Sequence, residues 1–307
     1  MPAEIEPSPA IAVEAALVED LEDVTRGRLV LRRFLRKKIA VGGLIVLVLL
    51  IAFAFGGPYL SKWDYRSTDY NSFLQKPSST HWFGTTQIGQ DVYAQTLRGL
   101  QKSLVIGLLT AFFSTGLAAA VGASAGYFGG WTDRVLMWFV DLLLVLPQFL
   151  IIAILSPSFR GKTWLVFVFL LAAFSWMVTA RIVRGLTLSL KEQEFVQAAR
   201  FTGVPARKII FRHLLPNMSS FLIIDATLNV GGAILAETGL SYFGFGVQSP
   251  DVSLGTLIAA GTRSAITFPW LFLFAGGALI ITVLSVSVIG DGLRDALDPN
   301  SATSIKP

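Results

Sequence analysis

The sequence contains no cysteine and only 2 histidines among its 307 residues. This excludes disulfides, thiolate metal ligands and a cysteine nucleophile, and two histidines make a histidine-based metal cluster a poor expectation. Charged residues are also scarce, at 15% of the chain, whereas 53% of it is hydrophobic and the mean hydropathy is +0.63. Because soluble domains carry about 25% charged residues, the composition excludes an ordinary water-soluble protein and indicates a membrane protein.

Two catalytic signatures are missing as well. The sequence has no glycine-rich phosphate loop of the form G-x-x-x-x-G-K-[ST], so we do not expect it to hydrolyse ATP. Its serines, histidines and aspartates do not have the spacing of a hydrolase motif. We therefore expect a protein that is not an enzyme, with no catalytic residues, cofactor or metal of its own.

Charge is distributed unevenly along the chain. Seven acids and no base lie in the first 23 residues, and 25 bases face 13 acids from residue 24 onward. The bases lie beside apolar runs, which favours anionic membrane lipid over nucleic acid as their partner. Residues 1–25 are predicted to be a disordered, acidic cytoplasmic tail. The basic segment 26–38 is predicted to lie along the inner membrane surface.

Six apolar stretches are long enough to cross a bilayer, which takes about 20 residues each. They are residues 39–60, 103–126, 135–155, 164–180, 219–240 and 270–289. With the N-terminus and every second loop assigned to one side, that side holds 17 lysines and arginines and the other side holds 8. The positive-inside rule then places both termini in the cytoplasm and the loop 61–102 outside. The sequence thus predicts an all-α, polytopic protein with a six-span domain over residues 39–298 and a short cytoplasmic tail over residues 299–307.

The loop between the fourth and fifth predicted spans, residues 191–216, is unusually polar and is predicted to be a cytoplasmic helical hairpin. Gly203 supplies a left-handed stop after the first helix, Pro205 suits the first turn of the second, and Pro216 is expected to end it. The face of the first helix consists of Phe195, Ala198, Ala199 and Thr202, and that of the second of Ile209, Ile210, His213 and Leu214. A rigid hairpin between two spans would let a soluble partner push on both spans together.

The same hairpin carries a family resemblance. Residues 197–217, QAARFTGVPARKIIFRHLLPN, resemble the cytoplasmic EAA loop of binding-protein-dependent ABC importer permeases, commonly E-A-A-x3-G-x9-I-x-L-P. The matching residues are Ala198, Ala199, Gly203, Leu215 and Pro216. Gln197 replaces the usual Glu and His213 the usual Ile.

Two further segments narrow the resemblance to the dipeptide, oligopeptide and nickel permease family. Residues 83–104, FGTTQIGQDVYAQTLRGLQKSL, are similar to its outer segment, with agreement at Gly84, Thr85, Gly89, Asp91, Gly99, Ser103 and Leu104. Thr86, Gln90 and Gln101 stand where that family commonly has charged residues. Residues 233–250, AILAETGLSYFGFGVQSP, resemble a second family segment, and Asp133, Asp141 and Pro147 also occur where the family often places them.

The resemblance implies a type I permease subunit of an ABC importer in the bacterial inner membrane, forming half of an alternating-access pathway for peptides. It implies a homologous second permease, two ATP-binding subunits that hold ATP and magnesium, and an extracytoplasmic substrate-binding protein. The residues expected to contact the ATP-binding subunits are Gln197, Ala198, Ala199, Gly203, Val204, Arg207, Leu215 and Pro216.

A carboxylate inside a predicted span requires a structural or functional role, since placing it at the bilayer centre costs about 2.5–3.5 kcal/mol. Asp141, Asp225 and Glu237 are the candidates, either for contact with the cargo in the pathway or for pairing within the bundle. Pairing is favoured for Asp141 and Asp225. The glycines Gly122, Gly126 and Gly130 are spaced by four, which permits close helix contact within the bundle or between subunits.

Two other classes of protein remain open. A proton-coupled secondary transporter would work without partner subunits, although the spans hold no histidine or lysine to partner the carboxylates. A membrane anchor would bind a soluble protein at the hairpin without moving any cargo. Within the ABC architecture, nickel chelates and haem are alternative cargoes to peptides.

Overall fold

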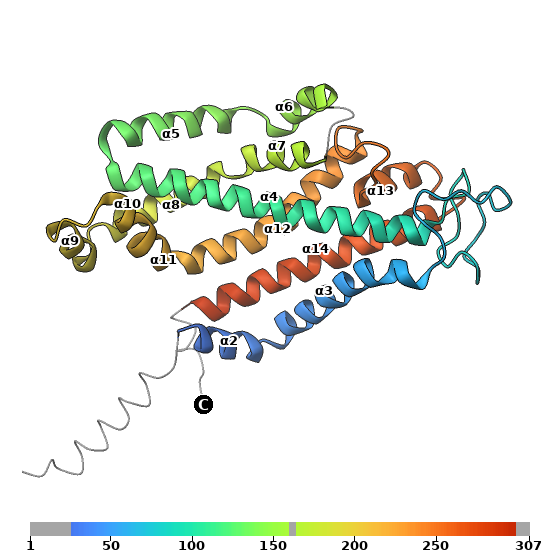
Figure 1. Ribbon diagram of the computed structural model, residues 1–307, viewed down its shortest axis with the longest axis horizontal. Helices are drawn as coiled ribbons and strands as arrows, with labels where there is room; N and C mark the ends of the chain where they lie inside the picture. Colours follow the sequence, from blue (N-terminus) through green and yellow to red (C-terminus); the bar gives the residue numbers. More distant parts are fainter. Residues whose placement is uncertain (1–25, 160–163, 299–307) are drawn as a thin grey trace, which may run out of the picture.

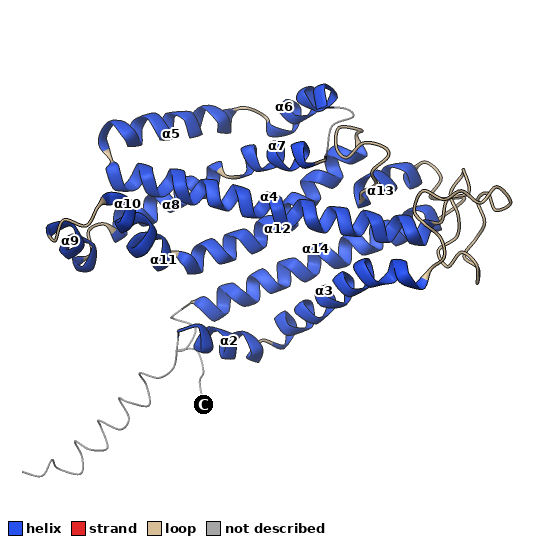
Figure 2. Cartoon of the chain, viewed as in Figure 1, coloured by secondary structure: helices blue, strands red, loops and turns tan. Residues whose placement is uncertain are grey.

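The computed structural model describes residues 26–159 and 164–298. The predicted tails, residues 1–25 and 299–307, lie outside these described residues. In the described part, the regular elements are helices, apart from two isolated β-bridges near residues 68–91 (Figure 2). The all-α prediction is therefore confirmed.

Four helices are long and apolar enough to cross a membrane unbroken. They are α3 (Lys38–Gly56, continued by the 3-10 turn η1, Gly57–Leu60), α4 (Val92–Phe128), α12 (Ser219–Tyr242) and α14 (Trp270–Leu297). The 37 residues of α4 rise about 1.5 Å each, so this helix exceeds the ~30 Å hydrocarbon core and projects beyond it.

Two further spans are broken helices. The pair α5 (Gly130–Val145) and α6 (Gln148–Leu155, followed by η2, Ser156–Phe159) is bent by 79°. The pair α7 (Leu165–Ser175) and α8 (Met177–Leu190) is bent by 47°. If each pair is one span, the described residues hold the six spans that were predicted. The prediction of one continuous span over residues 135–155 is wrong in detail, because Leu146 and Pro147 adopt extended backbone between the two halves.

The connection between α3 and α4 is shorter than predicted. Helix α4 begins at Val92, because the Asp91 carboxylate accepts the Ala94 N–H at 2.8 Å and caps the helix there. The predicted outer loop 61–102 is therefore a connection over residues 61–91 followed by the first turns of α4. At the other side of the bundle, α8 continues past the predicted span end at Ala180 to Leu190.

Helix α4 lies at the centre of the bundle, between α8, α12 and α14 (Figure 1). Its glycines allow α8 to approach closely: a Cβ at Gly126 would lie 2.7 Å from Thr187 Cβ and 2.8 Å from the Arg184 carbonyl oxygen. Gly122 lies equally close to Ala180 and Val183. Gly122 and Gly126 thus serve packing within this chain, whereas Gly130 begins α5 and has no atom of the described residues within 4 Å of its Cβ position.

The two ends of the bundle differ in character (Figure 1). One end carries α2 (Arg26–Arg36), the end of α14 and three short helices that follow α8. The other end carries residues 61–91 and α13 (Leu254–Thr262). Phe34 of α2 is buried against α14, and Lys37 pairs with Asp295 at 2.8 Å, so α2 is held to the bundle.

Candidate functional site

The predicted hairpin is formed by α9 (Glu194–Phe201) and by α10 (Ala206–Ile209), the π-helical turn η3 (Ile210–Leu214) and α11 (Leu215–Asn217). Gly203 has φ of +76°, as its predicted left-handed stop requires. Its N–H donates to the Arg200 carbonyl at 3.0 Å, and the Val204 N–H donates to the Ala199 carbonyl at 3.0 Å. These two bonds are those of a Schellman motif, which ends α9 and reverses the chain.

One face of the hairpin is buried in the bundle. Its buried side chains are Val196, Ala199, Ile209, Ile210 and Leu214. They form one cluster with Ala123 of α4, Val183 of α8 and Met218, and Phe221 and Leu222 of α12 pack against that cluster. The hairpin is therefore anchored on three membrane-spanning helices at once.

The opposite face is exposed and partly apolar. The Phe201 side chain is 88% exposed and that of Phe195 is 41% exposed, with the exposed Ala198 on the same helix. Phe195 and Phe201 thus leave apolar surface on this face of the hairpin. Of the residues expected to contact ATP-binding subunits, those exposed are Ala198, Gly203, Arg207 and Pro216. Gln197, Val204 and Leu215 are half-buried, and Ala199 faces the bundle.

Pro216 does not end the second helix of the hairpin, contrary to the prediction. Helical backbone continues through Pro216 to Asn217, and the break comes at Met218. Pro216 is tolerated because it lies in the first turn of α11, directly after the π-helical turn, where its missing N–H costs little. His213 is half-buried, and its carbonyl accepts the Asn217 side-chain amide at 2.6 Å.

Asp141 lies in α5 and pairs with Arg181 of α8. Arg181 donates to Asp141 Oδ1 from Nε at 3.1 Å and from Nη2 at 2.5 Å. One helical turn further along α8, Arg184 makes a two-bond pair with Asp133, with Nη2 at 2.6 Å from Oδ2. The sequence did not reveal these partners, because both arginines were predicted to lie in a cytoplasmic loop. Two acids in α5 and two arginines in α8 were the available sequence signal for this pairing.

Glu237 of α12 is completely buried. Its carboxylate accepts the Ser103 hydroxyl at 3.2 Å and the Ser241 hydroxyl at 2.5 Å. Ser103 also accepts the Leu254 N–H at 3.2 Å. The network joins α4, α12 and the start of α13, so the structure places Glu237 in the packing of the outer end rather than on an open surface.

Asp225 occupies a different environment. The Thr179 hydroxyl donates to Oδ1 at 2.9 Å, and the Thr115 hydroxyl and Asn229 amide donate to Oδ2 at 3.2 and 2.9 Å. The carboxylate lines a cavity of about 560 Å³ between α4, α8 and α12. Residues beside the breaks of both bent helix pairs, including Leu146 and Ser175, line the same cavity.

The connection over residues 61–91 is organised around His81. Its Nδ1 lies 2.8 Å from Asp91 Oδ2, its Nε2 lies 3.4 Å from Asp69 Oδ2, and Trp63 stacks on the ring with 4.6 Å between centroids. The pKa of Asp69 lies below its usual value, mainly because the Asn71 N–H donates to the carboxylate. His81 therefore connects the loop to the N-cap of α4.

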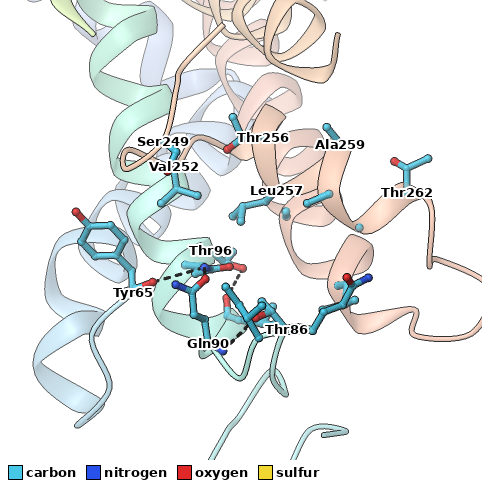
Figure 3. A pocket seen from close by; sticks show the side chains of 18 of the residues that line it. Tyr65, Thr86, Gln90, Thr96, Ser249, Val252, Thr256, Leu257, Ala259 and Thr262 are labelled. Atoms are coloured by element: carbon cyan, nitrogen blue, oxygen red, sulfur yellow. Dashed lines mark hydrogen bonds between the residues drawn. The ribbon is translucent and has the colours of Figure 1, made fainter. Parts of the chain in front are cut away.

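An outer pocket of about 840 Å³ opens beside this segment. Figure 3 shows Tyr65, Thr86 and Gln90 of the outer segment on one side and Thr256 and Leu257 of α13 on the other. Hydroxyl and amide groups predominate among its polar side chains. Arg66, Asp251 and Arg263 also line the pocket, so its wall carries charges of both signs.

Gln90 and Gln101, two of the residues that replace the family's charged residues, form hydrogen bonds at this end. Gln90 accepts a hydrogen bond from the Gln95 amide at 2.6 Å. Gln101 donates to the Ala54 carbonyl at 2.7 Å and so links α4 to α3. Positive charge in this region comes from Lys102, whose Nζ lies 3.2 Å from Asp251, and from Arg98, which lies 3.9 Å from the same carboxylate and donates to Gln101 at 3.2 Å.

Spanning helices, a polar cavity between broken helices and an anchored hairpin define a polytopic membrane transport subunit. The chain belongs to the binding-protein-dependent transport system inner membrane components, whose family model matches residues 118–302. Residues 25–77 match the N-terminal transmembrane domain of oligopeptide transport permease C. The chain is therefore a multi-pass permease component of the inner membrane and not an enzyme.

Relatives share nearly the whole chain. The oligopeptide transport system permease protein OppC of Mycobacterium tuberculosis is 56% identical over 281 residues, which cover 91% of this chain and 97% of that protein. The protein of the same name from Haemophilus influenzae is 40% identical over 270 residues, 87% of this chain and 86% of that protein. The similarity therefore includes the hairpin, the outer segment and the bundle between them.

Proposed function

We propose that this chain forms half of the pathway by which an ATP-driven importer carries peptides across the inner membrane. The named relatives act in oligopeptide transport, and the chain's own family works with a binding protein. The other half of the pathway would be a homologous permease. Two ATP-binding subunits, which hold the ATP and magnesium, would supply the energy, since this sequence has no phosphate loop.

The observation that carries this proposal is the two-faced hairpin. Val196 and Leu214 fix it to α4, α8 and α12, while Ala198 and Phe201 are presented on its free side. A small side chain at Ala198 lets the groove of a partner close tightly around α9. Movement of that partner would reach all three spans, because the buried face has few ways to deform without opening the core.

The charge distribution supports an orientation with both termini and the hairpin in the cytoplasm. Lysine and arginine are in excess on the side of the N-terminus and the hairpin, as the positive-inside rule requires for a cytoplasmic side. The basic helix α2 exposes Leu31 and Leu35, each 56% exposed, which would enter the lipid interface beside anionic headgroups. The outer pocket would then face the binding protein and receive the cargo it releases.

The test is a pair of substitutions at Ala198 in the transporter assembled with its second permease, ATP-binding subunits and binding protein. Ala198→Arg adds a long charged side chain to the exposed face and should reduce peptide uptake and stimulated ATP hydrolysis at least tenfold. Ala198→Ser keeps the side chain small and should retain both. Because neither side chain points into the core, membrane insertion and melting temperature should remain those of the parent.

Normal uptake by the Ala198→Arg transporter would contradict the coupling role of the hairpin. A gradient-driven uptake by this chain alone in liposomes would instead select a proton-coupled transporter. If the assembled transporter moved nickel chelates or haem but no peptide, the ABC architecture would stand and the peptide cargo would be wrong.

A further inference from the structure

The cavity beside Asp225 lies where two spans are interrupted. Leu146 and Gln148 flank the break between α5 and α6, and Ser175 and Met177 flank the break between α7 and α8. Backbone that leaves the helical conformation inside a membrane has to line a cavity or be buried in protein, because lipid cannot satisfy its polar groups. Two breaks that meet at one cavity are the arrangement by which transporters form a cargo site.

The charge in this cavity is uncompensated within the described part of the chain. Asp225 receives three hydrogen bonds, all from neutral groups, and no lysine or arginine forms a salt bridge with it there. A carboxylate offers about four acceptor positions. Oδ1 uses only the bond from Thr179, so it can accept another donor from the cavity.

A second polar group in the cavity is also unsatisfied. The Thr110 hydroxyl is completely buried, lines the same cavity and has no hydrogen-bond partner among the described residues. Leaving a buried hydroxyl unpaired is unfavourable, and a valine would fill the same volume without this cost. Thr110 and Asp225 thus place an unpaired hydroxyl and a negative charge in the wall of one cavity.

We infer that Asp225 binds the protonated amino terminus of a peptide in transit, and that Thr110, in the wall of the same cavity, bonds to a polar group further along that peptide. An ammonium group has three donors and supplies the positive charge that Asp225 lacks. The inference rests on the proposed function, because it assigns a place in the pathway to the peptide cargo. It makes Asp225 a determinant for cargo with a free amino group.

The experiment compares trialanine with N-acetyl-trialanine, which lacks the ammonium group, as cargo for the assembled transporter in liposomes. Each uptake rate is corrected for the affinity of the separate binding protein. Asp225→Asn keeps the shape and removes the charge, and should raise the KM for trialanine about tenfold, as the loss of one charge-assisted hydrogen bond predicts. The KM for N-acetyl-trialanine should change less than twofold.

Two further variants separate binding from folding. Thr110→Val should raise the KM for trialanine a few-fold without lowering the melting temperature of the transporter, because no bond within the chain is lost. Asp291→Asn removes a carboxylate from the exposed face of α14, away from the cavity, and should leave both KM values unchanged.

The outcomes are distinct. If the parent transporter takes up neither peptide, the proposed function fails. If it takes up trialanine and Asp225→Asn leaves the KM unchanged, the proposed function stands and the ammonium site is wrong. An equal loss of uptake for both peptides in Asp225→Asn would also overturn the site, because it would show a role in the bundle or in proton transfer that is independent of the amino group.

Discussion

Gly203 allows the rigidity of the coupling hairpin to be tested by one substitution. Its φ of +76° is accessible to glycine and unfavourable for other residues, and a Cβ placed there would meet no atom within 4 Å. Gly203→Ala therefore introduces backbone strain without a clash. The left-handed conformation costs a residue with a Cβ about 1–2 kcal/mol. The open form of the turn should become about 5- to 30-fold more populated.

The measurement is hydrogen exchange of the hairpin amides, with the subunit in a lipid nanodisc. The Val204 and Gly203 N–H groups form the two bonds that close the turn, so their protection should fall by the same factor. Gly185→Ala is the matched control, because Gly185 lies within α8, has no positive φ, and also has free space around its Cβ position. There alanine should stabilise the helix by about 0.5–1 kcal/mol.

The two substitutions are chemically identical, and the structure assigns them opposite effects. Equal exchange of the hairpin amides in Gly203→Ala and in the parent would refute the assignment of the turn. Faster exchange in Gly185→Ala would refute the reasoning from backbone conformation itself.

Two more predictions concern packing. Gly126→Leu should lower the melting temperature of the subunit sharply, because the leucine side chain would collide with Thr187 and the Arg184 carbonyl, at a cost of about 1–3 kcal/mol or more. Gly116→Leu in the same helix meets open space and should leave the melting temperature unchanged. Equal melting temperatures of the two variants would contradict the close contact of α4 with α8. Asp91→Ala should lower the melting temperature by the loss of the α4 cap, worth about 1 kcal/mol, and of the His81 contact, whereas Asp91→Asn keeps a capping oxygen and should cost less. Thermal unfolding followed by near-ultraviolet circular dichroism checks both, and an asparagine variant as unstable as the alanine variant would show that the cap is not the cause.

The features that the sequence predicts correctly are local ones. The helical period, the apolar stretches and the stop at Gly203 each depend on residues within a turn or two of one another. Ile209, Ile210 and Leu214 face the bundle as their spacing predicts. Such patterns record backbone geometry directly, which is why the amino-acid sequence alone is enough to place the spans and the hairpin.

The features that the sequence does not predict depend on contacts between distant segments. The pairing of Arg181 with Asp141 requires α8 to lie beside α5. The pattern along either helix does not show which helix it lies beside. The break at Pro147 is missed by hydropathy, which indicates one continuous span, although a proline followed by Gln148 is a signal for a helix break. The cavity containing Asp225 and Thr110 is formed by several helices together, and a pattern along one chain does not reveal which polar side chains share a space.

The buried carboxylate of Glu237 has a consequence for the order in which this protein is assembled. Its bond from Ser103 comes from a helix that is synthesised earlier, whereas the Leu254 N–H that donates to the same serine belongs to α13, which is synthesised later. When α12 enters the bilayer, one hydroxyl partner from another helix is therefore already present, and the network closes only after residues 243–253 have folded back. This network would then close after α12 has inserted, while the last spanning helix, α14, is still to be synthesised.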